Sequence, residues 1–351
     1  MHCYLHIGTE KTGTTLIQDF LHLNAEKLES LGFGYLRSAG YPNNMWAVVA
    51  AYDVDRRDRW TANKKVNTDA DLLHLQSIIT NGMREELASK KIKALVVSSE
   101  HIQSRLTNYS ELARLKDILE HLGVTSFSVI LYIRDPAQAA ASLYSTSIKS
   151  GSKKESPHFP QAANYNRICN HKFTIELFSS VFGEERLEVR LFEKDFLLNR
   201  SVLDDFLSLL RLSNSSEFNQ PKNENKALST LGLELLRRIN EHIPNLDERP
   251  RLALRREILS YWDKYFSDEK YILSNDLYLA YEQEFQESNE WVRSKFFPER
   301  SRLFRLRKRP NLDTSELNST QLDKLANLLS DIWLERERDL LQQASLNDQK
   351  A

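Results

Sequence analysis

The most informative segment of the chain reads Leu5-His6-Ile7-Gly8-Thr9-Glu10-Lys11-Thr12-Gly13-Thr14-Thr15-Leu16. The apolar run Cys3–Ile7 predicts a short buried strand, and the two glycines after it predict a tight loop. A helix with an apolar stripe is expected to start near Thr14 and to continue to Leu31. A buried strand, a glycine-containing loop and an amphipathic helix, in this order, are typical of the start of a parallel α/β fold.

The loop between Gly8 and Gly13 has the chemistry of an anion-binding site. Its glycines are five residues apart, as in the Walker phosphate loop, but Thr14 stands where the Walker lysine would be and the lysine lies inside the loop, at Lys11. Inward-pointing backbone N–H groups and the positive end of the following helix favour a bound anion. The Lys11 charge and the Thr14 and Thr15 hydroxyls add to this preference. A glycine turn with a threonine cap is the alternative interpretation.

The rest of the first half continues to alternate short apolar runs with longer helical patterns. Further strands are predicted at Gly34–Leu36, Ala94–Ser98, Phe127–Ile133 and Leu187–Leu191, and helices at Asp71–Leu87, Glu111–Leu122 and Asp204–Leu210. This alternation predicts a parallel central sheet flanked by helices. From Ala227 the sequence is mostly helical and strongly charged. We therefore expect an α/β core over residues 1–226 and a helical carboxyl-terminal region over residues 227–351, packed together as one continuous domain.

The composition is that of an ordinary globular protein. Of the 351 residues, 41% are hydrophobic and 28% are charged, and 48 basic against 49 acidic residues give a net charge of −1. A surface-wide attraction to nucleic acid is therefore not expected. Two cysteines, Cys3 and Cys169, are too few for a disulfide framework or a multi-cysteine metal site. Because no signal-peptide pattern and no apolar run of ~20 residues is visible, we expect a cytoplasmic protein without a transmembrane segment.

Two charged segments have open interpretations. Arg300–Arg309 contains six basic residues in ten, and it is either a solvated segment or a contact for an anionic polymer or a membrane surface. Lys222–Lys226 is either a linker before a helix or a loop that closes over a nucleotide. Nothing in the sequence indicates the oligomeric state.

A second motif follows the predicted strand Phe127–Ile133. Arg134 comes directly after this strand, Asp135 suits a helix N-cap, and Pro136 suits the first helical position. Ser142 lies about two turns into that helix, and because helical side chains lean toward the N-terminus, it can meet the same phosphate group as Arg134. Arginine suits this role since its planar guanidinium binds two phosphate oxygens at once. Taken alone, the motif is typical of an ordinary helix cap.

Two candidate bases follow the predicted strand Ala94–Ser98. Glu100 and His101 are expected at the carboxyl end of this strand, where ligands collect in open α/β sheets. We favour Glu100 and place His101 second. The alternative is a Ser-Ser-Glu helix cap followed by an exposed histidine. His6, in the first predicted strand, is expected to pack against its neighbours rather than to act as a base.

Both motifs resemble those of one enzyme family. The sequence Lys-Thr-Gly-Thr-Thr at Lys11–Thr15 resembles the 5′-phosphosulfate loop of sulfotransferases that use 3′-phosphoadenosine 5′-phosphosulfate (PAPS). Arg134-Asp135-Pro136 with Ser142 resembles the 3′-phosphate site of the same family. A weaker similarity extends through Leu187–Glu193 and Asn289–Phe304, the latter similar to a carboxyl-terminal feature of bacterial members that act on carbohydrates.

This resemblance implies a P-loop-like sulfotransferase fold and a role for each site residue. The donor's 5′-phosphosulfate would be held by Lys11, Thr12, Gly13, Thr14 and Thr15, with Lys11 at the bridging oxygen, and its 3′-phosphate by Arg134 and Ser142. A sulfuryl group would pass to a hydroxyl of a small-molecule or glycan acceptor without a metal ion, with Glu100 or His101 as the base. The alternatives are a P-loop kinase or NTPase, and a non-catalytic nucleotide-binding protein on the same scaffold.

Overall fold

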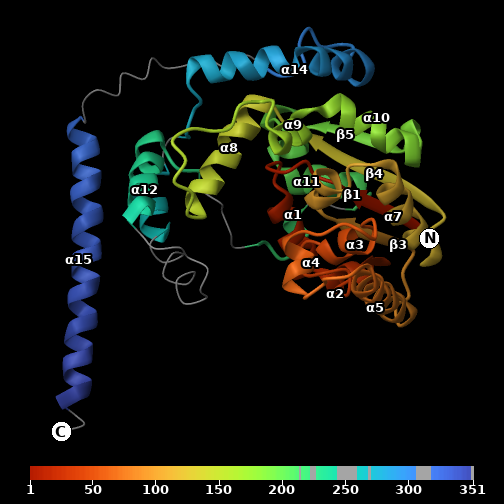
Figure 1. Ribbon diagram of the computed structural model, residues 1–351, viewed down its shortest axis with the longest axis horizontal. Coiled ribbons are helices and arrows are strands. Elements are labelled where there is room, and N and C mark those ends of the chain that lie inside the picture. The colour runs from red at the N-terminus through yellow and green to blue at the C-terminus, as the bar shows by residue number, and fades with distance from the viewer. Residues whose placement is uncertain (213–214, 222–226, 243–258, 268–269, 306–317, 349–351) are drawn as a thin grey trace. The chain divides into compact units, whose positions relative to one another are not determined.

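The computed structural model describes the chain except residues 213–214, 222–226, 243–258, 268–269, 306–317 and 349–351 (Figure 1). The chain divides into two compact units. The first comprises residues 1–139, 158–223 and 275–304, and the second comprises residues 140–157, 224–274 and 305–351. The domain boundary predicted after residue 226 adjoins the segment 222–226, outside the described residues, and stays a prediction.

The first unit is built on a five-stranded sheet in which all neighbouring strands are parallel (Figure 1). In the spatial order β2-β3-β1-β4-β5, the strands are β1 His2–His6, β2 Phe33–Tyr35, β3 Ala94–Ser98, β4 Ser126–Ile133 and β5 Leu187–Leu191. This sheet confirms the predicted fold class, and each strand lies within one residue of its predicted bounds. The strand order reverses at β1, which pairs with β3 on one side and β4 on the other. Such a reversal favours a ligand site at the carboxyl ends of the central strands.

Alternate residues of β3 and β4 belong to two different cores, one on each face of the sheet. Val96, Ile130 and Tyr132 pack in the core that includes helices α1 (Thr14–Leu23) and α11 (Val202–Leu209). The opposite core takes Leu95 and Val129 together with helices α3 (Met45–Ala50), α5 (Asp69–Ala88), α7 (Tyr109–His121) and α10 (His171–Phe182). Strands buried on both faces are nearly continuous apolar runs, which makes them recognisable in the sequence.

The structure describes further helices and short 3-10 helices in the first unit. They are helices α2 (Ala25–Ser30), α4 (Arg59–Asn63), α6 (Glu100–Arg105), α9 (Ala163–Cys169) and α14 (Asn275–Phe296), and 3-10 helices at Glu184–Arg186, Lys194–Phe196, Leu198–Arg200 and Ser215–Glu217.

The prediction of one helix that continues to Leu31 is wrong in its length, because the helix is interrupted at Asn24. The Asn24 side-chain amide donates hydrogen bonds to the carbonyl oxygens of Phe20 and Asn219, each at 2.9 Å, and its backbone leaves the helical conformation.

The second unit is helical in every element that the structure describes. Helix α8 (Pro136–Lys149) starts in the first unit and enters the second at Ala140, whereas α12 (Thr230–His242) and α15 (Ser319–Asp348) belong wholly to the second. Its core is formed by Tyr144, Ile148, Leu228, Leu233, Leu236, Trp262, Phe266 and Leu328. Over the described parts of the chain, no helix is both long and apolar enough to cross a membrane.

Candidate functional site

The loop after β1 begins as a continuation of that strand. The backbone N–H of Thr9 donates to the carbonyl of Tyr132 at 2.8 Å, and the N–H of Tyr132 donates to the carbonyl of Gly8 at 2.7 Å. These bonds extend the β1–β4 pairing past the last residue of β1. The first residues of the loop are therefore fixed against the carboxyl end of β4, where Arg134 follows.

The middle of the loop turns back on itself through residues with positive φ. Lys11 has a φ of 68° and Gly13 a φ of 80°. The Thr12 hydroxyl donates to the carbonyl of Thr9 at 2.6 Å, and both threonines are buried. The Thr12 side chain thus closes the loop from within.

Both loop glycines allow close approaches that a side chain would prevent. A Cβ at Gly13 would lie 3.3 Å from the ring of Phe192 and 3.3 Å from a methyl of Val202. A Cβ at Gly8, where φ is +99°, would lie 3.1 Å from both Cα and Cβ of Glu100. Gly8 therefore brings the loop directly against the favoured candidate base.

Helix α1 opens immediately after the loop. Gly13 is its N-cap and makes no side-chain hydrogen bond, so the first N–H groups of the helix depend on other partners. Thr14, the first helical residue, is nearly buried, whereas the side chain of Thr15 is exposed. The predicted loop-to-helix junction is confirmed, and an N-terminus arranged in this way favours an anion.

Arg134 lies against this loop. Its Nη1 donates to the carbonyl of Lys11 at 2.8 Å, and its guanidinium lies 5.7 Å from the centre of the Phe192 ring. Asp135 caps the following helix, as predicted, by accepting a hydrogen bond from the N–H of Gln138 at 2.8 Å. The two sequence motifs are thus joined in space by a direct hydrogen bond.

The backbone of Arg134 is held by a buried histidine. Nε2 of His171, the first residue of α10, donates to the Arg134 carbonyl at 2.9 Å. Burial lowers the pKa of His171 to about 4, so this ring is neutral near pH 7. Ser142, the other residue predicted at the 3′-phosphate, lies on α8 in the second unit, where its carbonyl accepts a hydrogen bond from Thr146 at 3.0 Å. Its role beside Arg134 stays a prediction.

Glu100 and His101 lie together at the end of β3, at the start of α6. Their side chains are 16% and 17% exposed, and Glu100 Oε1 lies 4.0 Å from His101 Nε2. Burial lowers the pKa of His101, although the Glu100 and Glu10 carboxylates oppose this shift. The two candidate bases therefore lie close together beside the loop, and both are partly exposed.

Gln18 is a site residue for which the sequence gives little signal. Its Nε2 donates to Glu100 Oε2 at 2.6 Å, and the residue is 3% exposed on α1. In the sequence it is one polar position in an amphipathic helix. Its only distinguishing feature is that it faces the sheet, among apolar neighbours such as Ile17 and Leu21.

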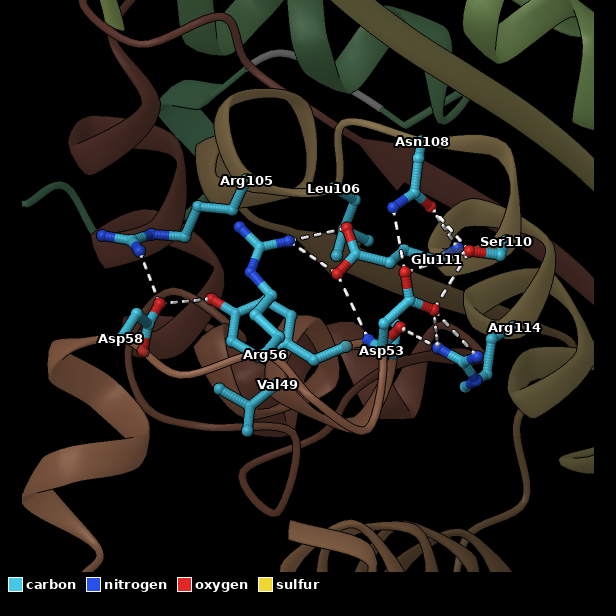
Figure 2. A network of polar contacts seen from close by, with 12 residues as sticks. Val49, Asp53, Arg56, Asp58, Arg105, Leu106, Asn108, Ser110, Glu111 and Arg114 are labelled. Carbon is cyan, nitrogen blue, oxygen red and sulfur yellow. Dashed lines mark hydrogen bonds and ion pairs between the residues drawn. The ribbon is translucent and has the colours of Figure 1, made fainter. Parts of the chain in front are cut away.

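Trp60, on α4, lies beside His101, with the two ring centres 6.0 Å apart. The start of α4 is capped by Asp58, which accepts hydrogen bonds from the N–H groups of Trp60 and Thr61. Asp58 also pairs with Arg105 of α6 at 2.7 Å (Figure 2). Asp58 thus joins the start of α4 to α6.

The polar network continues from the start of α4 to α7. Both carboxylate oxygens of the buried Glu111 lie 2.6 Å from Arg56 Nη1, and Asp53 bonds Arg114 and Ser110 (Figure 2). Breaking one partner of such a buried pair leaves an uncompensated charge. The network therefore fixes the segment from Asp53 to Asp58, which leads into α4, to the sheet-covering helices α6 and α7.

Several buried polar atoms near the candidate bases have no hydrogen-bond partner among the described residues. Ser99 Oγ, His101 Nδ1 and Trp60 Nε1 are among them. Buried polar atoms are nearly always paired. Unpaired donors and acceptors therefore lie near Glu100, between α6 and α4.

His6 is packed, as predicted. Its Nδ1 is 2.8 Å from the Ser98 hydroxyl, and burial lowers its pKa to about 3.

The start of the basic run Arg300–Arg309 is also packed. The Arg300 side chain is 11% exposed, and its guanidinium lies 4.0 Å from the Phe196 ring centre and 3.9 Å from the Glu193 carboxylate. Residues 306–309 of the run, like Lys222–Lys226, lie outside the described residues. Within the described parts, no group of three or more His, Cys, Asp or Glu side chains is arranged to hold a metal ion.

Among solved structures, the chain is similar to a sulfotransferase from Alicyclobacillus acidocaldarius, with 16% sequence identity and a TM-score of 0.35, over 74% of this chain and 97% of that one. No protein-family model and no curated protein matches the sequence. A structural similarity this low does not indicate an activity.

Proposed function

We propose that the chain is a sulfotransferase that moves a sulfuryl group from PAPS to a hydroxyl of a carbohydrate-type acceptor and releases adenosine 3′,5′-bisphosphate. The observation that carries the proposal is the hydrogen bond of 2.8 Å between Arg134 Nη1 and the Lys11 carbonyl. It brings a guanidinium to an anion-binding loop that already contains a lysine. A donor with phosphate groups at both its 5′ and 3′ positions needs cationic groups at two neighbouring places.

The loop and Arg134 fit such a donor in chemical type. The backbone N–H groups of residues 12–15, with the Thr14 and Thr15 hydroxyls, would bind the 5′-phosphosulfate at the start of α1. Lys11 would hold the oxygen that bridges phosphorus and sulfur. Arg134 would bind the 3′-phosphate, with Ser142 as a further candidate ligand.

The transfer needs a base that accepts the acceptor's proton, a leaving group, and positive charge that stabilises the leaving oxygen. The acceptor oxygen attacks sulfur in line, so a new O–S bond forms as the bond from sulfur to the bridging oxygen breaks. The acceptor proton passes to Glu100, and the bridging oxygen leaves with its electron pair on the phosphate, where the positive charge of Lys11 stabilises it. No divalent cation is required, because Lys11 and Arg134 supply the positive charge.

Glu100 is the better placed of the two candidate bases. The closeness of Gly8 to Glu100 supports this choice: a Cβ added at Gly8 would lie 3.1 Å from the Cα and Cβ of Glu100, so the loop that would hold the sulfuryl group passes directly beside it. His101 lies farther along α6, toward Trp60. We propose that the partly exposed rings of His101 and Trp60, whose centres are 6.0 Å apart, pack against a sugar acceptor.

The decisive experiment is an activity screen with labelled PAPS against a panel of bacterial oligosaccharides, with and without a chelator. Turnover that persists in chelator supports the proposal. Stabilisation by Mg-ATP but not by adenosine 3′,5′-bisphosphate would instead favour a P-loop kinase or NTPase. Binding of the bisphosphate without turnover of any acceptor, and with no effect of Glu100→Gln, would favour a non-catalytic nucleotide-binding protein.

A further inference from the structure

We propose that Gln18 is a positioning residue that aims the Glu100 carboxylate at the acceptor, an inference that rests on the proposed function. Gln18 is 3% exposed, and its Nε2 lies 2.6 Å from Glu100 Oε2 and 3.5 Å from the carbonyl oxygen of Ser98. The amide nitrogen carries two N–H donors, so one side chain faces both acceptors at the end of β3.

This contact distinguishes the two oxygens of the carboxylate. Oε2 accepts a hydrogen bond from the Gln18 amide. Because the acceptor is a carboxylate, this bond is stronger than one between two neutral groups. Oε1 is the oxygen that lies toward His101, 4.0 Å from its Nε2. We therefore assign proton acceptance to Oε1. Gln18 forms and breaks no covalent bond during the transfer. It holds the carboxylate in one orientation.

The position of Gln18 on α1 links the base to the donor site. Gln18 follows Thr14 by four residues, which is about one helical turn. The same helix therefore presents its first residues to the 5′-phosphosulfate and its second turn to the base. Because α1 packs in the core through Ile17, Phe20 and Leu21, donor and base share one rigid support. A small misalignment of the reacting groups slows a reaction strongly, and the shared support of donor and base prevents such a misalignment.

The test compares Gln18→Met, which keeps the size of the side chain and removes the donor, with Gln18→Asn, which keeps the amide and shortens its reach. Both variants should lose about 10–100-fold in kcat, as expected for a misaligned reacting group. Affinity for adenosine 3′,5′-bisphosphate, measured by calorimetry, should stay within about twofold, because the loop and Arg134 are unchanged.

Gln103→Met is the matched control. Gln103 is a buried glutamine on α6, the helix that starts at Glu100, but its amide donates to the Arg167 carbonyl at 2.8 Å and to the Thr174 hydroxyl at 2.9 Å. Losing these bonds should lower the melting temperature and leave kcat within about twofold of wild type. Gln18→Asn covers the case in which Gln18→Met does not fold.

A double-mutant cycle separates positioning from a purely structural role. In the Glu100→Gln background the base is absent, so a second change, Gln18→Met, should cost less than about twofold in kcat. Equal losses in both backgrounds, or full activity of the single Gln18 variants, would overturn the inference while the proposed function stands. If Glu100→Gln itself has wild-type kcat, the proposed role of Glu100 fails, and the role of Gln18 fails with it.

Discussion

Arg134 donates a hydrogen bond from Nη1 to the carbonyl oxygen of Lys11 at 2.8 Å. The two residues are far apart in the sequence, one after β4 and one in the loop after β1, and strand pairing brings them together. Arginine at this position therefore has two tasks: it supports the turn at Lys11, and it provides a cationic group beside the loop.

Arg134→Ala should weaken the binding of adenosine 3′,5′-bisphosphate more than it slows turnover. The lost hydrogen bonds to a charged group are worth about 1.5–3 kcal/mol, which is about 10–100-fold in affinity. Calorimetric titration measures this loss. Adenosine 5′-phosphate, which lacks the 3′-phosphate, should lose less affinity than the bisphosphate, because for this nucleotide the variant removes only the support that Arg134 gives to the turn at Lys11. Arg84→Ala, an exposed residue of α5 that bonds Asn81, is the control. A uniform loss for both nucleotides would contradict the assignment to the 3′-phosphate.

Lys11→Ala should lower kcat by about 10²–10³-fold, the usual cost of removing one group that stabilises developing charge. The fold should survive, because Lys11 is only partly buried. Single-turnover kinetics with labelled PAPS measures the chemical step directly. Lys91→Ala removes an exposed lysine at the opposite, amino-terminal end of β3 and should have wild-type kinetics. Unchanged turnover in Lys11→Ala would remove Lys11 from the mechanism.

Gly13→Ala should damage both stability and donor binding. Alanine at positive φ costs about 1–2 kcal/mol in the free energy of unfolding, and its Cβ would press on Phe192 and Val202 at 3.3 Å. Gly123→Ala is the matched control, because Gly123 has a φ of +90° and a Cβ placed there would meet nothing within 4 Å. Both variants should unfold at lower urea concentrations, and only Gly13→Ala should bind the bisphosphate more weakly. Equal affinities would show that the loop backbone does not hold the donor.

Two buried histidines predict that the fold loses stability in mild acid. Burial lowers the pKa of His6 to about 3 and that of His171 to about 4, from an ordinary value of 6.5. Between these values the unfolded chain binds protons that the folded chain does not. The free energy of unfolding should therefore be greatest above about pH 6.5 and should fall as the pH drops toward the folded-state values.

Urea unfolding at about pH 7.5 and about pH 5 measures this pH dependence. The fall in stability between the two should be smaller in His171→Gln, which keeps a donor for the Arg134 carbonyl. His74→Gln, an exposed residue of α5, should leave the fall unchanged. A wild-type protein that is equally stable at both pH values would contradict the inferred neutrality of the buried rings.

The sheet was predictable because its strands are buried on both faces. Val129–Ile133 and Ala94–Val97 are continuous apolar runs, and helices that cover both faces of a parallel sheet require such runs. The glycine-containing loop between β1 and α1 was predictable for a similar reason, since glycine spacing and the following helix are local features. The interruption of the first helix at Asn24 was not, because its amide bonds Asn219, a residue far along the chain.

The less predictable parts of the site depend on tertiary contacts. Gln18 reaches Glu100 because α1 packs over the end of β3, and the Asp58–Arg105 pair joins the start of α4, which carries Trp60, to α6, which carries His101. Arg300 belongs to a basic run that typically would be solvated, but Phe196 and Glu193 bury its first residue. Local sequence patterns carry no information about partners that folding brings from elsewhere.

The most direct test of the central claim is a crystal structure of the chain with adenosine 3′,5′-bisphosphate. We expect the 5′-phosphate on the backbone N–H groups of residues 12–15, with Lys11 beside it, and the 3′-phosphate within hydrogen-bond distance of the Arg134 guanidinium. A nucleotide bound elsewhere, or a guanidinium turned away from the 3′-phosphate, would contradict the account.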